Sequence, residues 1–265
     1  MLEKKRLLIV TQDLDPFTEI SSVGIIAGKL PKLAGETYDI RILMPRFPSI
    51  NERRHRLHEV VRLSGMNIIV AGEDFPLLIK VASLPGTRLQ VYFLDNEEFF
   101  KRDYDLIGPT EADNEDNPHR AIFFCKGVME IVKKFGWTPN IIHCHGWFSS
   151  LVPAYLKTAY KLDPIFANAK VVYSAYTDDP QPPIDKTLVP KASINNLDSK
   201  QLTPYAEGFH NGAYHFADGI IEVGDDITEG QLPKVKTKKQ HYQHGLHDTE
   251  ELWAKYAAMY KKLGG

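Results

Sequence analysis

The stretch N-I-I-H-C-H-G-W-F-S-S-L-V-P, from Asn140 to Pro153, decides the fold. Ile141 and Ile142 begin a run of the kind that forms a buried strand, and a helical pattern starts at Leu151. A polar and aromatic turn therefore joins a strand to a helix. Ligands bind at the carboxyl ends of the strands in a parallel α/β sheet, and a helix start offers free N–H groups to an anion. The pattern predicts a ligand-binding cleft at this turn.

Polar side chains that follow other predicted strands should meet the same turn. A short apolar strand at residues 7–10 and another at 170–173 are each followed by polar residues. The carboxyl ends of parallel strands share one edge of a sheet, so we expect these segments to line one cleft. The candidate cleft residues from this argument are Asp13, His145, Trp147, Ser149, Ser150 and Tyr176.

Two histidines in the turn allow several interpretations. His143 and His145 point to the same side of the strand, because side chains alternate along it. A metal site is not favoured, since no carboxylate or thiolate stands at ligand spacing beside them. A catalytic histidine is a second interpretation. We favour a third, with one histidine satisfied in the core and one at a pocket rim. No metal and no cofactor are expected, and the catalytic residues are not assigned.

Composition excludes several classes of protein. The chain has 265 residues and a net charge of −2, which gives no electrostatic case for binding nucleic acid. No apolar run approaches the ~20 residues of a membrane span. The apolar run that follows the basic first residues is too short to be the core of a signal peptide. Two cysteines, Cys125 and Cys144, are too few for a disulfide framework. We therefore expect a cytoplasmic protein.

Strand and helix patterns alternate along the chain, which is typical of an α/β fold with a mostly parallel sheet and helices on both faces. A pair of antiparallel strands around residues 72–74 should form an inserted β-hairpin. The further expected strands cover residues 38–44, 66–70, 77–84, 89–94 and 219–223, and the expected helices cover 120–135, about 151–162 and 201–216.

The character of the chain changes after residue 230, so we expect one domain over 1–230 and a basic linker over 231–247. The segment 248–265 should be a helix that begins with a capping box of Asp248 and Glu251. Its apolar stripe, with Trp253 and Tyr256, must dock on this chain or on a partner. Docking on this chain is the more economical arrangement.

The stretch Trp137 to Pro153 resembles bacterial glycogen synthase and plant starch synthase, which read roughly W-x-P-D-I-I-H-C-H-D-W-H-T-G-L-V-P there. The resemblance covers most of residues 6 to 225 and only the amino-terminal half of that enzyme. It implies a Rossmann-like domain of the GT-B amino-terminal type. Further matching segments are Asp15-Pro16-Phe17, Leu30–Lys32, Val91–Phe100 and Asp116–Phe124.

Three departures from the family pattern predict a degenerate active site. The family loop K-T-G-G-L, implied to approach sugar-nucleotide phosphates, aligns with Glu19 to Val23 and places Ser21 and Ser22 at the cleft. A histidine implied to face the reacting sugar aligns with Phe148, and another is lost in the segment Tyr173–Tyr176. Loss of one preorganised donor typically costs about 100- to 1,000-fold in rate.

Two functions follow from the resemblance. The first is a glycosyltransferase of the glycogen/starch synthase type, which transfers glucose from a nucleotide sugar to an α-1,4-glucan. A second chain would have to supply the missing carboxyl-terminal domain. The second is a glucan-binding or regulatory protein without transferase activity. The expected partners are therefore an α-glucan or a sugar nucleotide, and a second protein chain that supplies the carboxyl-terminal domain.

Overall fold

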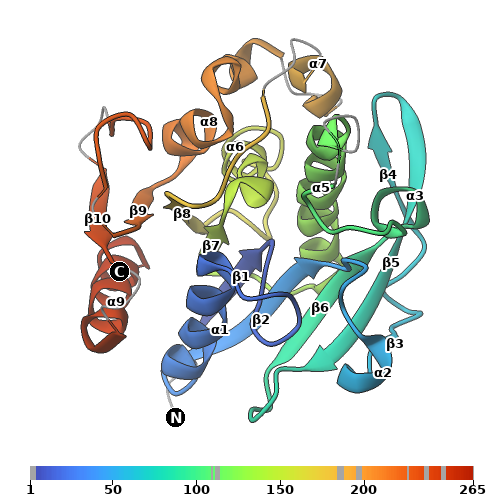
Figure 1. The fold of residues 1–265 in the computed structure, drawn as a ribbon, viewed down its shortest axis with the longest axis horizontal. Coiled ribbons are helices and arrows are strands. Elements are labelled where there is room, and N and C mark those ends of the chain that lie inside the picture. The colour runs from blue at the N-terminus through green and yellow to red at the C-terminus, as the bar shows by residue number, and fades with distance from the viewer. Residues whose placement is uncertain are drawn as a thin grey trace.

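A computed structural model describes residues 4–108, 110, 114–183, 188–194, 199–225, 227–235, 239–245 and 249–264. Within these residues, one ten-stranded sheet runs through the molecule, with helices on both of its faces (Figure 1). The strand order is β10-β9-β8-β7-β1-β2-β6-β5-β3, and β4 pairs with β5 outside this path. The pairs from β10 to β6 are parallel, whereas the pairs that involve β5 are antiparallel. The expected mostly parallel sheet with an inserted hairpin is confirmed.

The strands are β1 (Lys5–Thr11), β2 (Tyr38–Pro45), β3 (His58–Glu59), β4 (Met66–Val70), β5 (Glu73–Ser83), β6 (Gln90–Asp95), β7 (Ile141–His145), β8 (Lys170–Tyr176), β9 (Gly219–Val223) and β10 (Gln240–His244). The helices are α1 (Ser22–Ala34), α2 (Glu52–His55), α3 (Glu97–Phe100), α5 (Asn117–Phe135), α6 (Leu151–Lys157), α7 (Leu188–Ala192), α8 (Phe209–Phe216) and α9 (Thr249–Gly264), and the 3-10 segments are η1 (Trp147–Ser149) and η2 (Ser199–Glu207).

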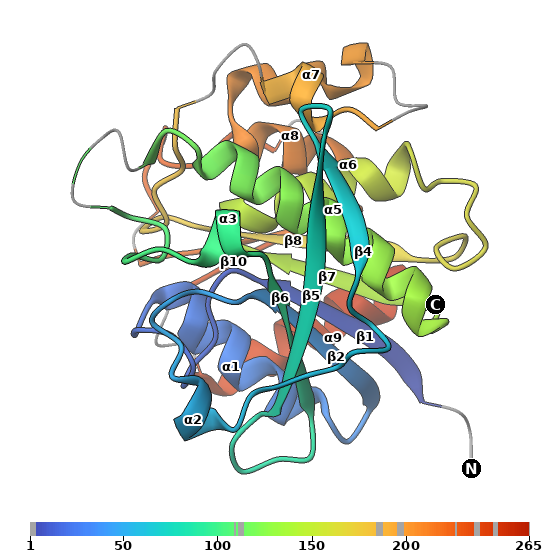
Figure 2. The same cartoon turned by 90° about the vertical axis from the view of Figure 1, so that its right-hand side faces the viewer.

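Two layers of helices cover the sheet. Figure 2 shows α1 and α9 on one face and α5, α6 and α8 on the other. The central strands β1, β7 and β8 are buried along almost their whole length. Covering on both faces explains why their sequences read as continuous apolar runs and do not alternate.

Three expected elements differ from the structure. Strand β8 continues to Tyr176, so this residue belongs to the strand and does not follow it. Helix α6 ends at Lys157, before the expected end near residue 162. The expected helix over 201–216 is divided at Gly208, whose φ of +146° is open to glycine but strained for other residues.

The expected basic linker over 231–247 contains a strand that the sequence analysis missed. Strand β10 pairs in parallel with β9, from Gln240 against Gly219 to His244 against Val223. Its sequence, Q-H-Y-Q-H, is polar because it lies at the edge of the sheet. Residues 236–238 and 246–248 lie outside the described residues, and these include Asp248 of the expected capping box. The division of the chain into domains stays a prediction.

Helix α9 packs on the sheet of its own chain. Tyr256, Met259 and Tyr260 are at most 1% exposed, whereas Trp253 is only half-buried. The Tyr260 hydroxyl makes a 2.5 Å hydrogen bond with His143 Nδ1 on β7. Helix α9 can approach β9 closely because residue 219 is a glycine. A Cβ at this position would collide with the Met259 sulfur. The apolar stripe of α9 is therefore covered within this chain.

We expect Tyr260→Phe to lower the free energy of unfolding by about 1–3 kcal/mol, because it leaves His143 Nδ1 buried without its partner. Tyr260→Ala should cost roughly 3–5 kcal/mol, since it also creates a cavity. Trp253→Ala should cost less than that, because the ring is half-exposed. Urea unfolding followed by circular dichroism measures each value, with Tyr242→Phe on the edge strand as the control. Equal stability of Tyr260→Phe and the control would contradict this account of the docking.

Candidate functional site

The ends of β1, β7 and β8 lie side by side at the carboxyl edge of the sheet. Thr11 is in register with His145, and His145 is in register with Ser174. The residues that follow these strands therefore converge, as the sequence analysis expects. We call the group Gln12, Asp13, Ser21, Ser22, Gly146, Trp147, Asp178 and Asp179 the carboxyl-edge cluster.

Gln12 and Asp179 hold the turn that follows β7. The Gln12 amide donates from Nε2 to Asp179 Oδ1 over 2.7 Å, and Gln12 Oε1 accepts from the backbone N–H of Phe148 over 3.0 Å. Asp179 Oδ2 accepts from the backbone N–H of Trp147 over 2.9 Å. Gly146 has a φ of +77°, and a Cβ at this position would collide with the Gln12 amide. Only glycine fits this turn.

The start of α1 is capped by serine and faces carboxylates. Ser21 Oγ accepts from the Gly24 N–H over 3.0 Å and donates to Asp13 Oδ2 over 3.0 Å. Ser22 Oγ donates to Asp178 Oδ2. Asp13 and Asp178 therefore lie at the positive end of the helix dipole, where an anionic ligand would otherwise bind.

Gly24 and Gly28 have a structural role in this arrangement. A Cβ at Gly28 would come within 2.8 Å of the Asp15 carbonyl oxygen, and one at Gly24 within 3.2 Å of the capping Ser21 Oγ. The absence of a side chain at Gly28 thus allows α1 to approach the loop after β1.

The structure buries five of the expected cleft residues beneath the carboxyl edge. His145, Trp147, Ser149, Ser150 and Tyr176 are each at most 2% exposed. His145 Nδ1 makes a 2.8 Å hydrogen bond with the Tyr176 hydroxyl, and Ser149 Oγ donates to the Gly146 carbonyl over 2.9 Å. The structure therefore brings these residues together as packing groups. Whether any of them contacts a ligand stays a prediction.

Both histidines of β7 are 0% exposed and lie in the core, so the expectation that one of the two stands at a pocket rim is wrong. His143 also makes a 2.7 Å hydrogen bond from Nε2 with Ser174 Oγ. Burial, with the neighbouring histidines, lowers the pKa of His143 well below its ordinary value, and burial lowers the pKa of His145 to about 3. Both rings are therefore neutral near pH 7. Among the described residues, no group of three or more His, Cys, Asp or Glu side chains could hold a metal.

Two carboxyl groups at the edge have raised pKa values. Burial raises the pKa of Asp179 to about 7, against the hydrogen bonds from Trp147 and Gln12, and the Asp13 and Asp178 carboxylates add to the effect. Burial likewise raises the pKa of Asp13 to about 6, although the bond from Ser21 opposes it. Gln12, Asp178 and Asp179 were not among the candidate cleft residues. Their position directly after β1 and β8 is the signal that could have identified them.

The departures from the family pattern have visible consequences. Phe148, which aligns with a family histidine, is fully buried between the rings of Phe47 and Phe124, at 5.8 and 5.4 Å between centroids. It belongs to the core and has no polar group to offer a substrate. Glu19 and Ile20 of the α1 loop are exposed, Ile20 at 84%.

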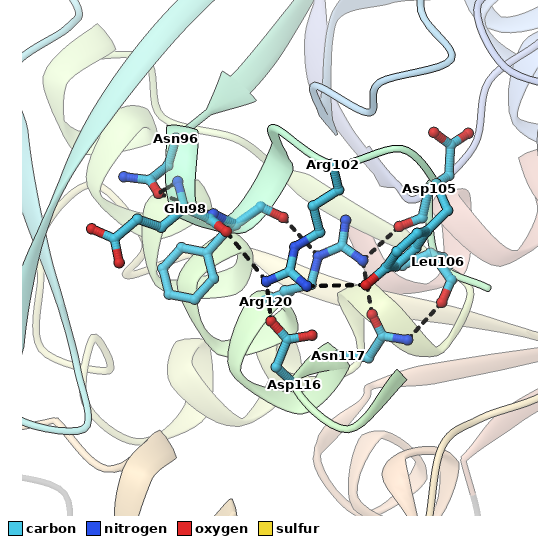
Figure 3. A network of polar contacts seen from close by, with 10 residues as sticks. Asn96, Glu98, Arg102, Asp105, Leu106, Asp116, Asn117 and Arg120 are labelled. Atoms are coloured by element: carbon cyan, nitrogen blue, oxygen red, sulfur yellow. Dashed lines mark hydrogen bonds and ion pairs between the residues drawn. The ribbon is translucent and has the colours of Figure 1, made fainter. Parts of the chain in front are cut away.

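A buried arginine of α5 holds the loop that follows α3 (Figure 3). Arg120 is 0% exposed and donates from Nε to the Phe99 carbonyl over 2.8 Å and from Nη1 to Asn117 Oδ1 over 2.8 Å. Nη1 also donates to the Asp105 carbonyl over 2.5 Å. The Asp105 carboxylate is close enough to Asp13 to contribute to its raised pKa. The loop thus adds negative charge to the carboxyl edge.

We expect Asp179→Asn to change how stability depends on pH. The pKa of Asp179 is higher in the folded than in the unfolded chain, so the folded state binds more protons between pH 4 and 7. Stability of the natural chain relative to Asp179→Asn should therefore fall by about 2–4 kcal/mol as the pH rises through this range, and stay level above it. Urea unfolding at several pH values measures this difference. The exposed Asp103→Asn should show none, and an Asp179→Asn difference independent of pH would contradict the assignment.

Several known proteins are similar to this chain in sequence. A family model described as the starch synthase catalytic domain matches residues 6–229. The glycogen synthase of Chlorobium limicola is 36% identical over 260 residues, which cover 91% of this chain and 52% of that protein. The glycogen synthase of Chlorobaculum parvum is 37% identical over 229 residues, covering 84% and 42%. This chain thus spans about half the length of the curated relatives it matches.

A solved structure has the same fold. The catalytic domain of starch synthase IV from Arabidopsis thaliana, bound to ADP and acarbose, superposes with a TM-score of 0.71 at 18% identity. The match covers 84% of this chain and 45% of that one. The likeness shows a GT-B type, Rossmann-like fold, as the sequence predicts. With a family model that matches 6–229, the chain belongs to the starch synthase catalytic domain family.

Proposed function

We propose that this chain acts as the amino-terminal half of a glycogen/starch synthase-type glycosyltransferase, and that its carboxyl edge receives sugar hydroxyls and not nucleotide phosphates. Membership of the family and the names of the matching relatives support the reaction class. Transfer of glucose from a nucleotide sugar to an α-1,4-glucan would then need a carboxyl-terminal half, because the chain covers only 52% or less of these relatives.

The observation that carries the proposal is the pair of bonds at the start of α1. Ser21 donates to Asp13 and Ser22 donates to Asp178, so the chain's own carboxylates occupy the position that suits an anion. A phosphate here would meet like charges, which repel by about 1–4 kcal/mol per pair at 4 Å, depending on the exposure to water. Sugar hydroxyls are neutral donors, and carboxylate oxygens accept them well.

A second candidate, a glucan-binding or regulatory protein without transferase activity, is favoured by Phe148. Its ring is buried in the core, where the family pattern has a polar donor. An exposed Glu19 stands where the family has a lysine. These changes affect catalysis and phosphate binding and leave a neutral sugar unaffected, so both candidates share the glucan ligand and differ in the transferase activity.

We propose a cytoplasmic location. The two cysteines, Cys125 and Cys144, are free and buried, and burial raises the pKa of the Cys125 thiol to about 12, so it stays protonated. A reduced setting suits free thiols of this kind. No helix in the described ranges has the length and apolar character needed to cross a bilayer.

Calorimetric titration tests the ligand preference. Maltoheptaose should release measurable heat on binding, whereas ADP-glucose and UDP-glucose should show none at micromolar concentrations. A micromolar dissociation constant for ADP-glucose, equivalent to about −8 kcal/mol, would overturn the proposal. Asp13→Asn combined with Asp178→Asn should weaken the binding of maltoheptaose, because two acceptors lose half of their lone pairs. Asp74→Asn, an exposed change on the hairpin, should leave it unchanged.

A transfer assay separates the two candidates. The chain should be incubated with labelled ADP-glucose and glycogen, alone and with the carboxyl-terminal half of a relative such as the Chlorobium limicola glycogen synthase. Glucose incorporation in the mixture above that of either part supports the transferase. Glucan binding without any incorporation supports the non-catalytic candidate.

A further inference from the structure

Helix α5 carries a buried lysine, Lys126, that is not part of the carboxyl-edge cluster. Lys126 is only 6% exposed. Its Nζ donates to the Ile69 carbonyl and to the Ser193 carbonyl, each over 2.9 Å. The third N–H reaches the Lys191 carbonyl only at 3.5 Å, which is the outer limit for a hydrogen bond. One donor of this ammonium group is therefore weakly engaged.

No carboxylate neutralises this lysine within the described ranges, since every ion pair there involves other residues. The same holds for Lys191 on α7. A buried charge without a counter-charge is costly, and burial lowers the pKa of Lys126 to about 8. At pH 7 most of the ammonium is still charged. An anion beside it would relieve this cost.

A pocket of about 280 Å³ opens at Lys126. Its lining comes from α5, from the β4–β5 hairpin and from α7 with the residues after it: Lys126; Ile69, Ala71 and Gly72; and Pro190, Lys191 and Ser193. Figure 2 shows the tip of this hairpin beneath α7. A Cβ at Gly72 would meet nothing within 4 Å, so the hairpin side of the pocket is open to solvent. The pocket shares no residue with the carboxyl-edge cluster.

We propose that this pocket binds the phosphate monoester group of a small molecule, held by the ammonium group of Lys126 in a lining that also includes Lys191. A phosphate monoester carries about −1.5 to −2 charges near pH 7, which suits a pocket lined by two lysines and no acidic residue among those described. Lysine binds phosphate as a point charge and needs no fixed geometry. The third N–H of Lys126 turns from the distant Lys191 carbonyl to a phosphate oxygen, and the two 2.9 Å bonds remain.

The volume of the pocket and its apolar residues indicate which kind of phosphate ester would fit. Ile69 is 47% exposed, and it stands with Ala71 beside the two lysines. A volume of about 280 Å³ holds a phosphate together with a short carbon chain or a ring. The ligand class is therefore a phosphorylated small metabolite.

Titration with inorganic phosphate and with phenyl phosphate tests the site, at constant ionic strength and with chloride as the reference anion. Phosphate should shift the amide resonance of Gly72 in a saturable way, and phenyl phosphate should bind more tightly because its ring contacts Ile69. Lys191→Glu should weaken the binding of both ligands at least 10-fold, since it replaces a positive charge with a negative one. Lys32→Glu, an equal change of charge on the exposed side of α1, should leave it unchanged.

A purely structural role for Lys126 gives a different result. If Lys126 binds phosphate, Lys126→Met should abolish the binding. If Lys126 only joins the hairpin to α7, the same substitution should lower the stability of the fold and leave the phosphate titration unchanged. If Lys126→Met does not fold, Lys191→Glu decides the question. No saturable shift at 10 mM phosphate in the natural chain, or unchanged affinity in Lys191→Glu, would overturn the proposal. The outcome is independent of glucan binding at the carboxyl edge.

Discussion

The carboxyl edge of the sheet depends on the Asp179 carboxylate. Its two oxygens accept from the Gln12 amide and from the Trp147 N–H, and so join the segments after β1, β7 and β8. A single group thus sets the conformation of the turn, which in turn requires glycine at position 146. The contact is costly, because the carboxylate is removed from water. The backbone of this turn is thus held in one conformation by side-chain hydrogen bonds.

The acidic character of this edge distinguishes the chain from the pattern of its family. Where that pattern places a lysine and bare backbone, the chain places Glu19, Ser21 and Ser22, and the serines donate to carboxylates. The changes are mutually consistent, since each replaces a cation or bare backbone with a carboxylate or with a hydroxyl that is bonded to a carboxylate. Lys126 and Lys191 show the opposite character at the pocket beside α7, where no described carboxylate pairs with either lysine.

The fold could be predicted from the sequence because its signals are local and repeated. Apolar runs such as Leu7 to Val10 and Ile141 to Ile142 occur only where a strand is covered on both faces. Strand β10 could not be predicted, because an edge strand needs little apolar surface and its pairing with β9 is set by tertiary contacts.

The site was predicted in part. Periodicity places Trp147 and Tyr176 near one edge but does not say whether a large side chain fills the core or faces a ligand, and both are buried. The bonds of Gln12 and Asp179 depend on side-chain directions that no sequence pattern encodes.

The position of β1 at the centre of the sheet has a consequence for how the molecule assembles. One neighbour of β1, strand β2, follows it closely in the chain, whereas the other, β7, comes much later. The Arg6 N–H, for example, donates over 2.8 Å to Asn140 Oδ1, which lies 134 residues further along the chain. Parallel pairs of such high contact order form slowly, because a long loop must close before they gain any contact. Until β7 is synthesised, one side of β1 remains an open apolar edge of the kind that pairs with other chains. The nascent chain is therefore most vulnerable to aggregation in the interval between the emergence of its first and its seventh strand from the ribosome.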